Sequence, residues 1–365
     1  MGWTTKDMRE DLKELRKMYH QEKDSDKKEE ILKDINTLIG NIVDYELVLD
    51  DVTQNAEDGP LELFAAAPMY ARYFPTVYKF INLVESLPYD YYLDTEVSYD
   101  PLASISKRDL FDILHEFFNS CGTKVAKYYN ELEKENDKYL IFDNERLSCS
   151  GNTYVVPRLG HRYIWIGTDG NPKNIPITMA HEYGHCIASK MYEHRYSDEK
   201  LFHEIESTFF ELLCEDYMYN EMNDPFYKKC LEEDVSAYYW SAKTATLYKR
   251  TFDYVFNNMS DDDSAKKYFN RYAKKHYGNT MIGDKKIVID LDSAMNYLFG
   301  YLCAVELFEI YKEDKELAID LLEKIVAKSD NEYESIYGNI TPVKSMKKHI
   351  NRFKGKNYVE WEDFK

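Results

Sequence analysis

Two histidines and a glutamate between residues 181 and 185 have the spacing of a metal-dependent hydrolytic site. The segment is His181-Glu182-Tyr183-Gly184-His185. Residues four apart lie on one face of a helix, so both imidazoles can bind the same metal ion. The carboxylate of Glu182 is turned to one side, where it can accept a proton from the attacking water and pass it to the leaving amine. The pattern predicts one Zn²⁺ per chain with Glu182 as general base. The alternative is an amphipathic helix with two structural histidines.

A zinc ion held by two histidines needs a third protein ligand and one open position. Glu204 follows His185 after a spacer of eighteen residues, and a turn followed by a second helix would return its carboxylate to the metal. Glu199, Glu206 and Glu211 are rivals by charge alone. Glu206 must face differently from Glu204, whereas Glu211 shares its face two turns further on. We favour Glu204 as the third ligand, and Glu211 either as a hydrogen-bond partner of a metal-binding histidine or as a member of an ion pair.

These two segments resemble the signature of a known family. HEYGH at 181–185 and HEIESTFFE at 203–211 are similar to the paired motifs of the oligoendopeptidase F and thimet oligopeptidase family of zinc metallopeptidases. The resemblance extends over about residues 150–312, less than half of the chain. It implies a zincin-like core of the gluzincin type with a helical lid. It also implies that His181, His185 and Glu204 bind zinc and that Glu182 is the general base of a metalloendopeptidase.

The resemblance also suggests which residues stabilise the oxyanion. Family members place a histidine and tyrosines in and before a late helix, and one tyrosine begins a Tyr-x-x-Gly run. In the matching stretch, 292–303, Tyr297 fits this pattern and Tyr301 shares its helix face. These two tyrosines are therefore the expected donors to the developing negative charge. No histidine stands just before them, and the nearest one upstream is His276. Because the chain has 33 tyrosines, ordinary helix packing is the alternative for both.

Two departures from the family pattern bear on the substrate. Only 180 residues precede the HExGH motif, fewer than family members usually carry, and the spacer before Glu204 is also shorter. We therefore expect a reduced lid over a cleft that admits peptides and excludes folded proteins. Zinc aminopeptidases use the same eighteen-residue spacer, but their Gly-x-Met-Glu-Asn segment is absent from this sequence. A further alternative is a catalytically silent peptide-binding or scaffold protein that retains the fold.

The elements that position these residues are mostly helices. Residues 5–56 read as a helical hairpin, and 138–167 as three or four short strands in a small, mostly antiparallel sheet. An exposed sheet edge near 163–167 would let an extended peptide add as a strand. A further helix is expected after the turn 168–172 and runs to about 192. The other expected helices are 61–87, interrupted at Pro68 and Pro75, and 106–135, 198–222, 226–257, 262–276, 291–312, 314–328 and 341–353. The predicted fold is mainly α with a small antiparallel-rich sheet (α+β), with residues 1–135 as a helical lid and 136–365 as the catalytic region.

Composition excludes several classes of function. Lys and Arg number 47 against 66 Asp and Glu, a formal net charge of −19, which repels phosphate backbones and argues against nucleic-acid binding. The longest apolar stretch, 297–305, is far too short to span a membrane. Six scattered cysteines with no CxxC pair and a charged N-terminal segment are typical of a cytoplasmic protein with reduced thiols. The expected partner is a peptide substrate.

Overall fold

The computed structural model describes residues 5–49, 73–86, 107–143, 151–156, 159–167, 172–191, 204–258, 262–277, 291–327 and 342–354. The chain forms two compact units, one of Met1–Asn55 with Tyr99–Ser197 and one of Ala56–Ser98 with Asp198–Lys365. The predicted division into a lid (1–135) and a catalytic region (136–365) concerns function and not these two units, and it stays a prediction. The first part of the predicted helix 61–87 and the turn before Glu204 lie outside the described residues.

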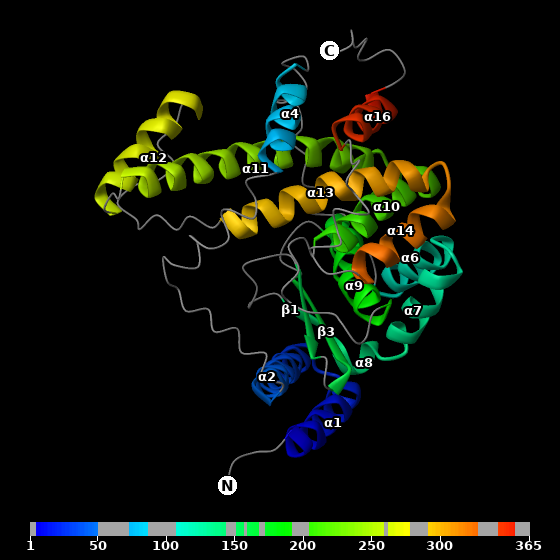
Figure 1. Cartoon of the computed structure of the whole chain (residues 1–365). Helices are drawn as coiled ribbons and strands as arrows, with labels where there is room; N and C mark the ends of the chain where they lie inside the picture. The colour runs from blue at the N-terminus through cyan, green and yellow to red at the C-terminus, as the bar shows by residue number, and fades with distance from the viewer. Residues whose placement is uncertain are drawn as a thin grey trace. The chain divides into compact units, whose positions relative to one another are not determined.

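The sheet of the first unit contains three described strands. They are β1 (Leu140–Asp143), β2 (Gly151–Val156) and β3 (His161–Gly167), in the order β1-β3-β2. Figure 1 labels β1 and β3 next to each other. β1 runs parallel to β3, with Leu140 opposite Ile164, and β2 runs antiparallel to β3, with Gly151 opposite Ile166. The sheet is therefore mixed, and the expectation of an exposed edge at 163–167 is wrong because β3 is paired on both sides. β2 lies at an edge of this sheet instead.

The burial of β3 explains its central position. Residues 162–167 are all buried, and a continuous apolar run such as Tyr163–Ile166 is typical of a strand that is covered on both faces. Tyr163 and Trp165 pack with the two N-terminal helices, so Ile164 and Ile166 point to the opposite face. Such a strand belongs inside a sheet and not at its edge.

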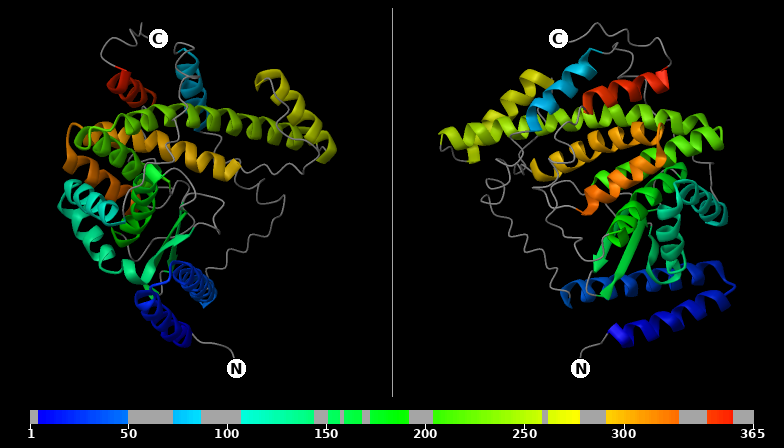
Figure 2. Two further views of the ribbon diagram at one scale, coloured as in Figure 1. Left: turned by 180° about the vertical axis from the view of Figure 1, so that it is seen from behind. Right: turned by 45° about the vertical axis from the view of Figure 1, so that its right-hand side comes forward.

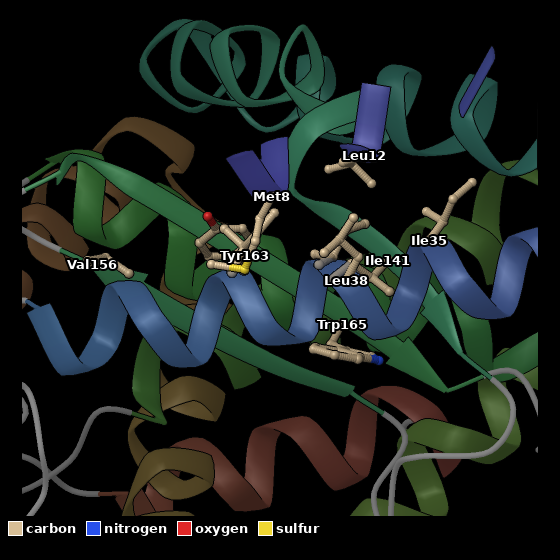
Figure 3. Packing of buried hydrophobic residues seen from close by; sticks show 10 residues of the cluster. Met8, Leu12, Ile35, Leu38, Ile141, Val156, Tyr163 and Trp165 are labelled. Carbon is tan, nitrogen blue, oxygen red and sulfur yellow. The ribbon is translucent and has the colours of Figure 1, made fainter. Parts of the chain in front are cut away.

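The predicted N-terminal hairpin is confirmed over its described part as α1 (Thr5–Gln21) and α2 (Ser25–Leu49), and 50–56 lie outside the described residues. Its apolar stripes pack against the sheet in a cluster that Figure 3 shows, formed by Met8, Leu12, Ile35, Leu38, Ile141, Val156, Tyr163 and Trp165. Arg9 adds a polar contact, because its Nη2 donates a hydrogen bond of 2.9 Å to the Tyr163 hydroxyl. The hairpin thereby fixes one face of the sheet.

The helix that carries the histidine motif also belongs to the first unit. α9 (Ile175–Met191) follows the short 3₁₀ turn η3 (Pro172–Asn174) and contacts β2 and β3. On its other sides it contacts α6 (Lys107–Ser120) and α7 (Thr123–Glu133), and α8 (Asn136–Tyr139) leads into β1. Tyr183 anchors α9 here, since its ring lies 5.1 Å from that of Tyr129 and its hydroxyl donates to Asn136 Oδ1 at 2.5 Å.

Helices alone make up the described part of the second unit. They are α4 (Phe74–Glu85), α10 (Ile205–Glu221), α11 (Pro225–Asn258), α12 (Asp262–Tyr277), α13 (Leu291–Tyr311), α14 (Lys315–Ala327) and α16 (Pro342–Lys354). The described bounds of α11 to α16 match the predicted ones to within one or two residues. α13 is apolar nearly all round, as expected of a central helix, and it contacts α10, α11, α14 and α16. Figure 2 shows α11 and α13 running alongside each other.

The fold class predicted from the sequence is confirmed, because the protein is mainly helical with one small sheet. The helices that the structure describes are too short or too polar to cross a lipid bilayer.

Candidate metal and peptide site

His181 and His185 lie one turn apart on α9, as their spacing predicts. Their ring centroids are 5.1 Å apart with the ring planes at 83°, and their nearest donor atoms lie within 4.8 Å of each other. Both side chains are half-buried. The opposite face of α9, including Met179, Tyr183 and Ile187, is fully buried, so the helix is held in place and the imidazole face is left accessible. Two imidazoles in this arrangement can bind one metal ion.

Glu182 is held by the neighbouring strand. Its side chain is 5% exposed, and Thr153 on β2 donates a hydrogen bond of 2.7 Å from Oγ1 to Oε2 of Glu182. Gly151 on the same strand leaves room for this carboxylate, since a Cβ at position 151 would lie 2.5 Å from Glu182 Oε1. Our reading of the sequence missed both residues. The only signal for them was their place in a strand directly before the motif helix.

Glu204 lies in the second unit, at the start of α10. It is 6% exposed, and Ser207 Oγ, 3.0 Å away, donates a hydrogen bond to its Oε2. Gly300 on α13 packs against it so closely that a Cβ there would lie 2.6 Å from Glu204 Cβ. Ser207, the serine of the segment 203–211, therefore orients the Glu204 carboxylate. Gly300, the glycine of the Tyr-x-x-Gly run, lets α13 approach Glu204 closely because it has no side chain.

The rival glutamates lie in different surroundings. Glu206 is 2% exposed in the first turn of α10. Glu211 lies near two further carboxyl groups, Glu215 on α10 and Asp234 on α11, which share a hydrogen bond. Burial and the nearby negative charges raise the pKa of both Glu215 and Asp234 well above the ordinary range. Glu211 contributes to this acidic cluster, and its predicted contact with a metal-binding histidine stays a prediction.

The two tyrosines expected at the oxyanion differ in exposure. Tyr301 is completely buried, and its ring stacks on Tyr238 of α11 at 3.9 Å with 6° between the planes. Tyr297 is 45% exposed and lines a pocket between α11 and α13. His276 is exposed near the end of α12, where its ring stacks on Tyr272 at 4.2 Å.

Cys186, which follows His185, packs into the core. It is fully buried, and this burial raises the pKa of its thiol to about 12. The thiol therefore stays protonated at neutral pH and is not a thiolate ligand.

Comparison with solved structures identifies the fold. An assigned oligoendopeptidase F from Bacillus anthracis str. Ames aligns with a TM-score of 0.54 at 12% identity, over 90% of this chain and 63% of that one. PZ peptidase A with an inhibitor aligns with a TM-score of 0.53 at 12% identity, over 96% of this chain and 67% of that one. A second oligoendopeptidase F structure aligns with the same TM-score and identity, over 96% and 66%. No family model and no curated protein matches the sequence.

The chain therefore has the fold of these peptidase structures, which confirms the family resemblance at the level of fold. It spans about two thirds of the length of the proteins that it resembles.

Proposed function

We propose that this chain, which has the fold of oligoendopeptidase F structures, is a zinc metallopeptidase that hydrolyses peptide bonds in peptides or oligopeptides. The observation that carries the proposal is the half-buried pair His181 and His185, with Glu182 between them held by a strand hydroxyl. A structural helix has no need for a buried carboxylate at this position. A hydrolytic site needs one as a general base.

The available donors fit Zn²⁺. Among the residues that the structure describes, His181, His185 and Glu204 are the combination of histidine, cysteine and acidic side chains that could hold a metal ion. Two imidazoles and one carboxylate form a typical donor set of catalytic zinc sites, which keep a fourth position open. Ser207 orients the Glu204 carboxylate, as expected for a ligand supported by its neighbours. A zinc ion bound there would supply Lewis-acid polarisation of the scissile carbonyl and would acidify water.

In the proposed reaction Glu182 accepts a proton at a carboxylate oxygen as water attacks the carbonyl carbon. It then returns this proton to the nitrogen of the leaving amine, so the general base becomes the general acid. Thr153 keeps the carboxylate in one orientation during both transfers. The hydroxyl of Tyr297 or Tyr301 donates a hydrogen bond to the carbonyl oxygen as negative charge develops there.

The substrate backbone has a natural partner in β2. This strand lies at an edge of the sheet and carries Thr153, which contacts Glu182. An extended peptide that adds to β2 through main-chain hydrogen bonds would bring a peptide bond beside the general base. In this proposal residues 136–365 do the chemistry, and residues 1–135 act as a lid that excludes folded proteins.

The proposal is tested by measuring zinc content and peptide cleavage on the same protein. We expect one zinc per chain by mass spectrometry, and cleavage of a mixed peptide library that a chelator abolishes and zinc restores. Glu182→Gln should keep its zinc and lose at least about a hundredfold in kcat, the range of general-base catalysis. Glu221→Gln, an exposed change on α10, is the matched control. A Glu182→Gln protein that cleaves normally would exclude the assigned role.

A further inference from the structure

One face of α11 and the first turns of α13 enclose a pocket of about 580 Å³. Small side chains make room for it, namely Ala237, Ser241 and Thr244 on α11 and Ala294 on α13. The three on α11 are spaced at intervals of three and four residues, so they form one stripe of the helix. The pocket therefore follows a stripe of small side chains on α11 that has large side chains on either side.

Aromatic rings form the wall of this pocket. Tyr238, Trp240 and Tyr248 come from α11, and Tyr297 comes from α13. Trp240 is 52% exposed and Tyr297 is 45% exposed, and large aromatic side chains left open to solvent around a pocket are a sign of a ligand. The stack on Tyr301 fixes the Tyr238 ring at 3.9 Å, so this part of the wall is preorganised. The faces of such rings attract cations.

A half-buried acidic side chain faces the same pocket. Asp234 is one of its lining residues, and Asp234 shares a hydrogen bond with Glu215. Glu215 is 2% exposed, and its Oε2 has no hydrogen-bond partner among the described residues. Glu211 and Glu233 add further negative charge beside the pair, which favours its protonated carboxyl groups. A cation in the pocket would counter this effect and favour the ionised form of Asp234.

On α13 the pocket wall lies close to the residue that contacts Glu204, the proposed metal ligand at the start of α10. Tyr297 precedes Gly300 by three residues on α13, and Gly300 is in tight contact with Glu204. One helical turn therefore separates the pocket wall from the Glu204 site. A substrate side chain near the cleaved bond can span this distance.

We infer that this pocket binds a lysine or arginine side chain of the peptide substrate, with the cation between the aromatic wall and Asp234. The inference rests on the proposed function, because it names the substrate class of that site. A long basic side chain suits the pocket, since its methylene stem packs against rings while its charged end reaches the acid. A guanidinium adds planar stacking on tyrosine and tryptophan.

The test compares peptides that differ only in arginine against citrulline, which has nearly the same shape without the charge. The residue is placed in turn at the three positions on each side of the cleaved bond. We expect kcat/KM of the zinc-loaded protein to be at least tenfold higher for arginine at one position. In Asp234→Asn and in Trp240→Ala this arginine-to-citrulline ratio should fall towards one. Glu221→Gln, which removes the same charge from an exposed place on α10, should keep the ratio.

Equilibrium binding separates a failure of this inference from a failure of the proposed function. Calorimetry with the same two peptides and the Glu182→Gln protein should give binding at least tenfold tighter for the arginine peptide, with or without zinc. If no peptide is cleaved but the arginine peptide still binds more tightly, the proposed peptidase function is wrong and the assignment of the pocket to a basic side chain is retained. Equal binding or equal cleavage of the two peptides, or a ratio that Asp234→Asn leaves unchanged, would overturn the pocket assignment.

Discussion

Thr153 Oγ1 lies 2.7 Å from Glu182 Oε2, so a side chain of the edge strand β2 holds the carboxylate of the motif helix α9. The same hydroxyl lies 3.1 Å from the backbone carbonyl oxygen of Glu182. A hydroxyl has one proton to donate, and the shorter contact to a charged oxygen is the stronger of the two. The strand and the general base are thus connected by one hydrogen bond.

Thr153→Val should therefore lower kcat without removing the metal. A hydrogen bond to a charged group contributes about 1.5–3 kcal/mol, so the expected loss is about tenfold to a hundredfold in kcat. KM and zinc content should stay near the values of the unchanged protein. Thr153→Ser retains the hydroxyl and should recover most of the rate. A valine variant with full kcat would show that Glu182 is positioned by other contacts.

A second prediction concerns the close contact between Gly151 and the Glu182 carboxylate. A methyl group at position 151 would lie 2.5 Å from Glu182 Oε1 and 2.8 Å from Thr178 Cγ2, so Gly151→Ala must displace one of them. We expect a loss of activity that exceeds the loss of stability, measured by peptide cleavage and by urea unfolding.

Gly160→Ala provides the contrast for Gly151. Gly160 has φ of 65° and open space around its Cβ position, so alanine there should lower the free energy of unfolding by about 1 kcal/mol. It touches nothing in the proposed site, and activity should remain. If both variants lose activity equally, the contact of Gly151 with Glu182 has no special role.

The histidine pair was predictable and its supporting strand was not, for a physical reason. His181 and His185 are brought together by helix geometry alone, which acts over four residues. The contact between Thr153 and Glu182 joins residues 29 apart and depends on the order of the strands. The exposed edge expected at 163–167 was wrong because β3 pairs with β2 in a local antiparallel hairpin and also with β1, which runs parallel to it on the other side.

The late helix shows a similar limit. Its bounds follow from its apolar composition, and the glycine of its Tyr-x-x-Gly run proved to be a close approach to Glu204. Tyr297 and Tyr301 lie on one helix face, so the local sequence pattern does not distinguish their environments. Their burial differs because the ring of Tyr238 on α11 stacks on Tyr301. Tyr238 is more than sixty residues away in the sequence, so the residue pattern of α13 alone could not predict this contact.

The identity of the third ligand is tested by two neighbouring glutamates. Glu204→Ala should weaken zinc binding by at least about a hundredfold, because a three-ligand site loses one donor. Glu206→Ala removes a carboxylate of similar burial two residues away and should leave zinc affinity almost unchanged. Titration with a chromophoric chelator measures both. The reverse order of the two affinities would move the ligand to Glu206 and break the alignment with the family motif.

Glu215 predicts how stability depends on pH. Burial and the charges of Asp234 and Glu211 raise its pKa well above the usual value, so the folded state binds this proton more tightly than the unfolded chain does. Its contribution to stability is therefore present below the unfolded pKa of about 4.3 and is lost as pH rises through the folded value.

Glu215→Gln removes this titration and retains an amide that can donate to Asp234. We expect the variant to exceed the unchanged protein in free energy of unfolding by about 1–2 kcal/mol above neutral pH, with the difference shrinking as pH falls towards 4. Urea unfolding at a series of pH values measures it. Glu221→Gln, exposed on the same helix, should show no such trend. A Glu215→Gln protein that is less stable at high pH than at low pH, relative to the unchanged protein, would mean that nearby donors or cations stabilise the Glu215 carboxylate as an anion.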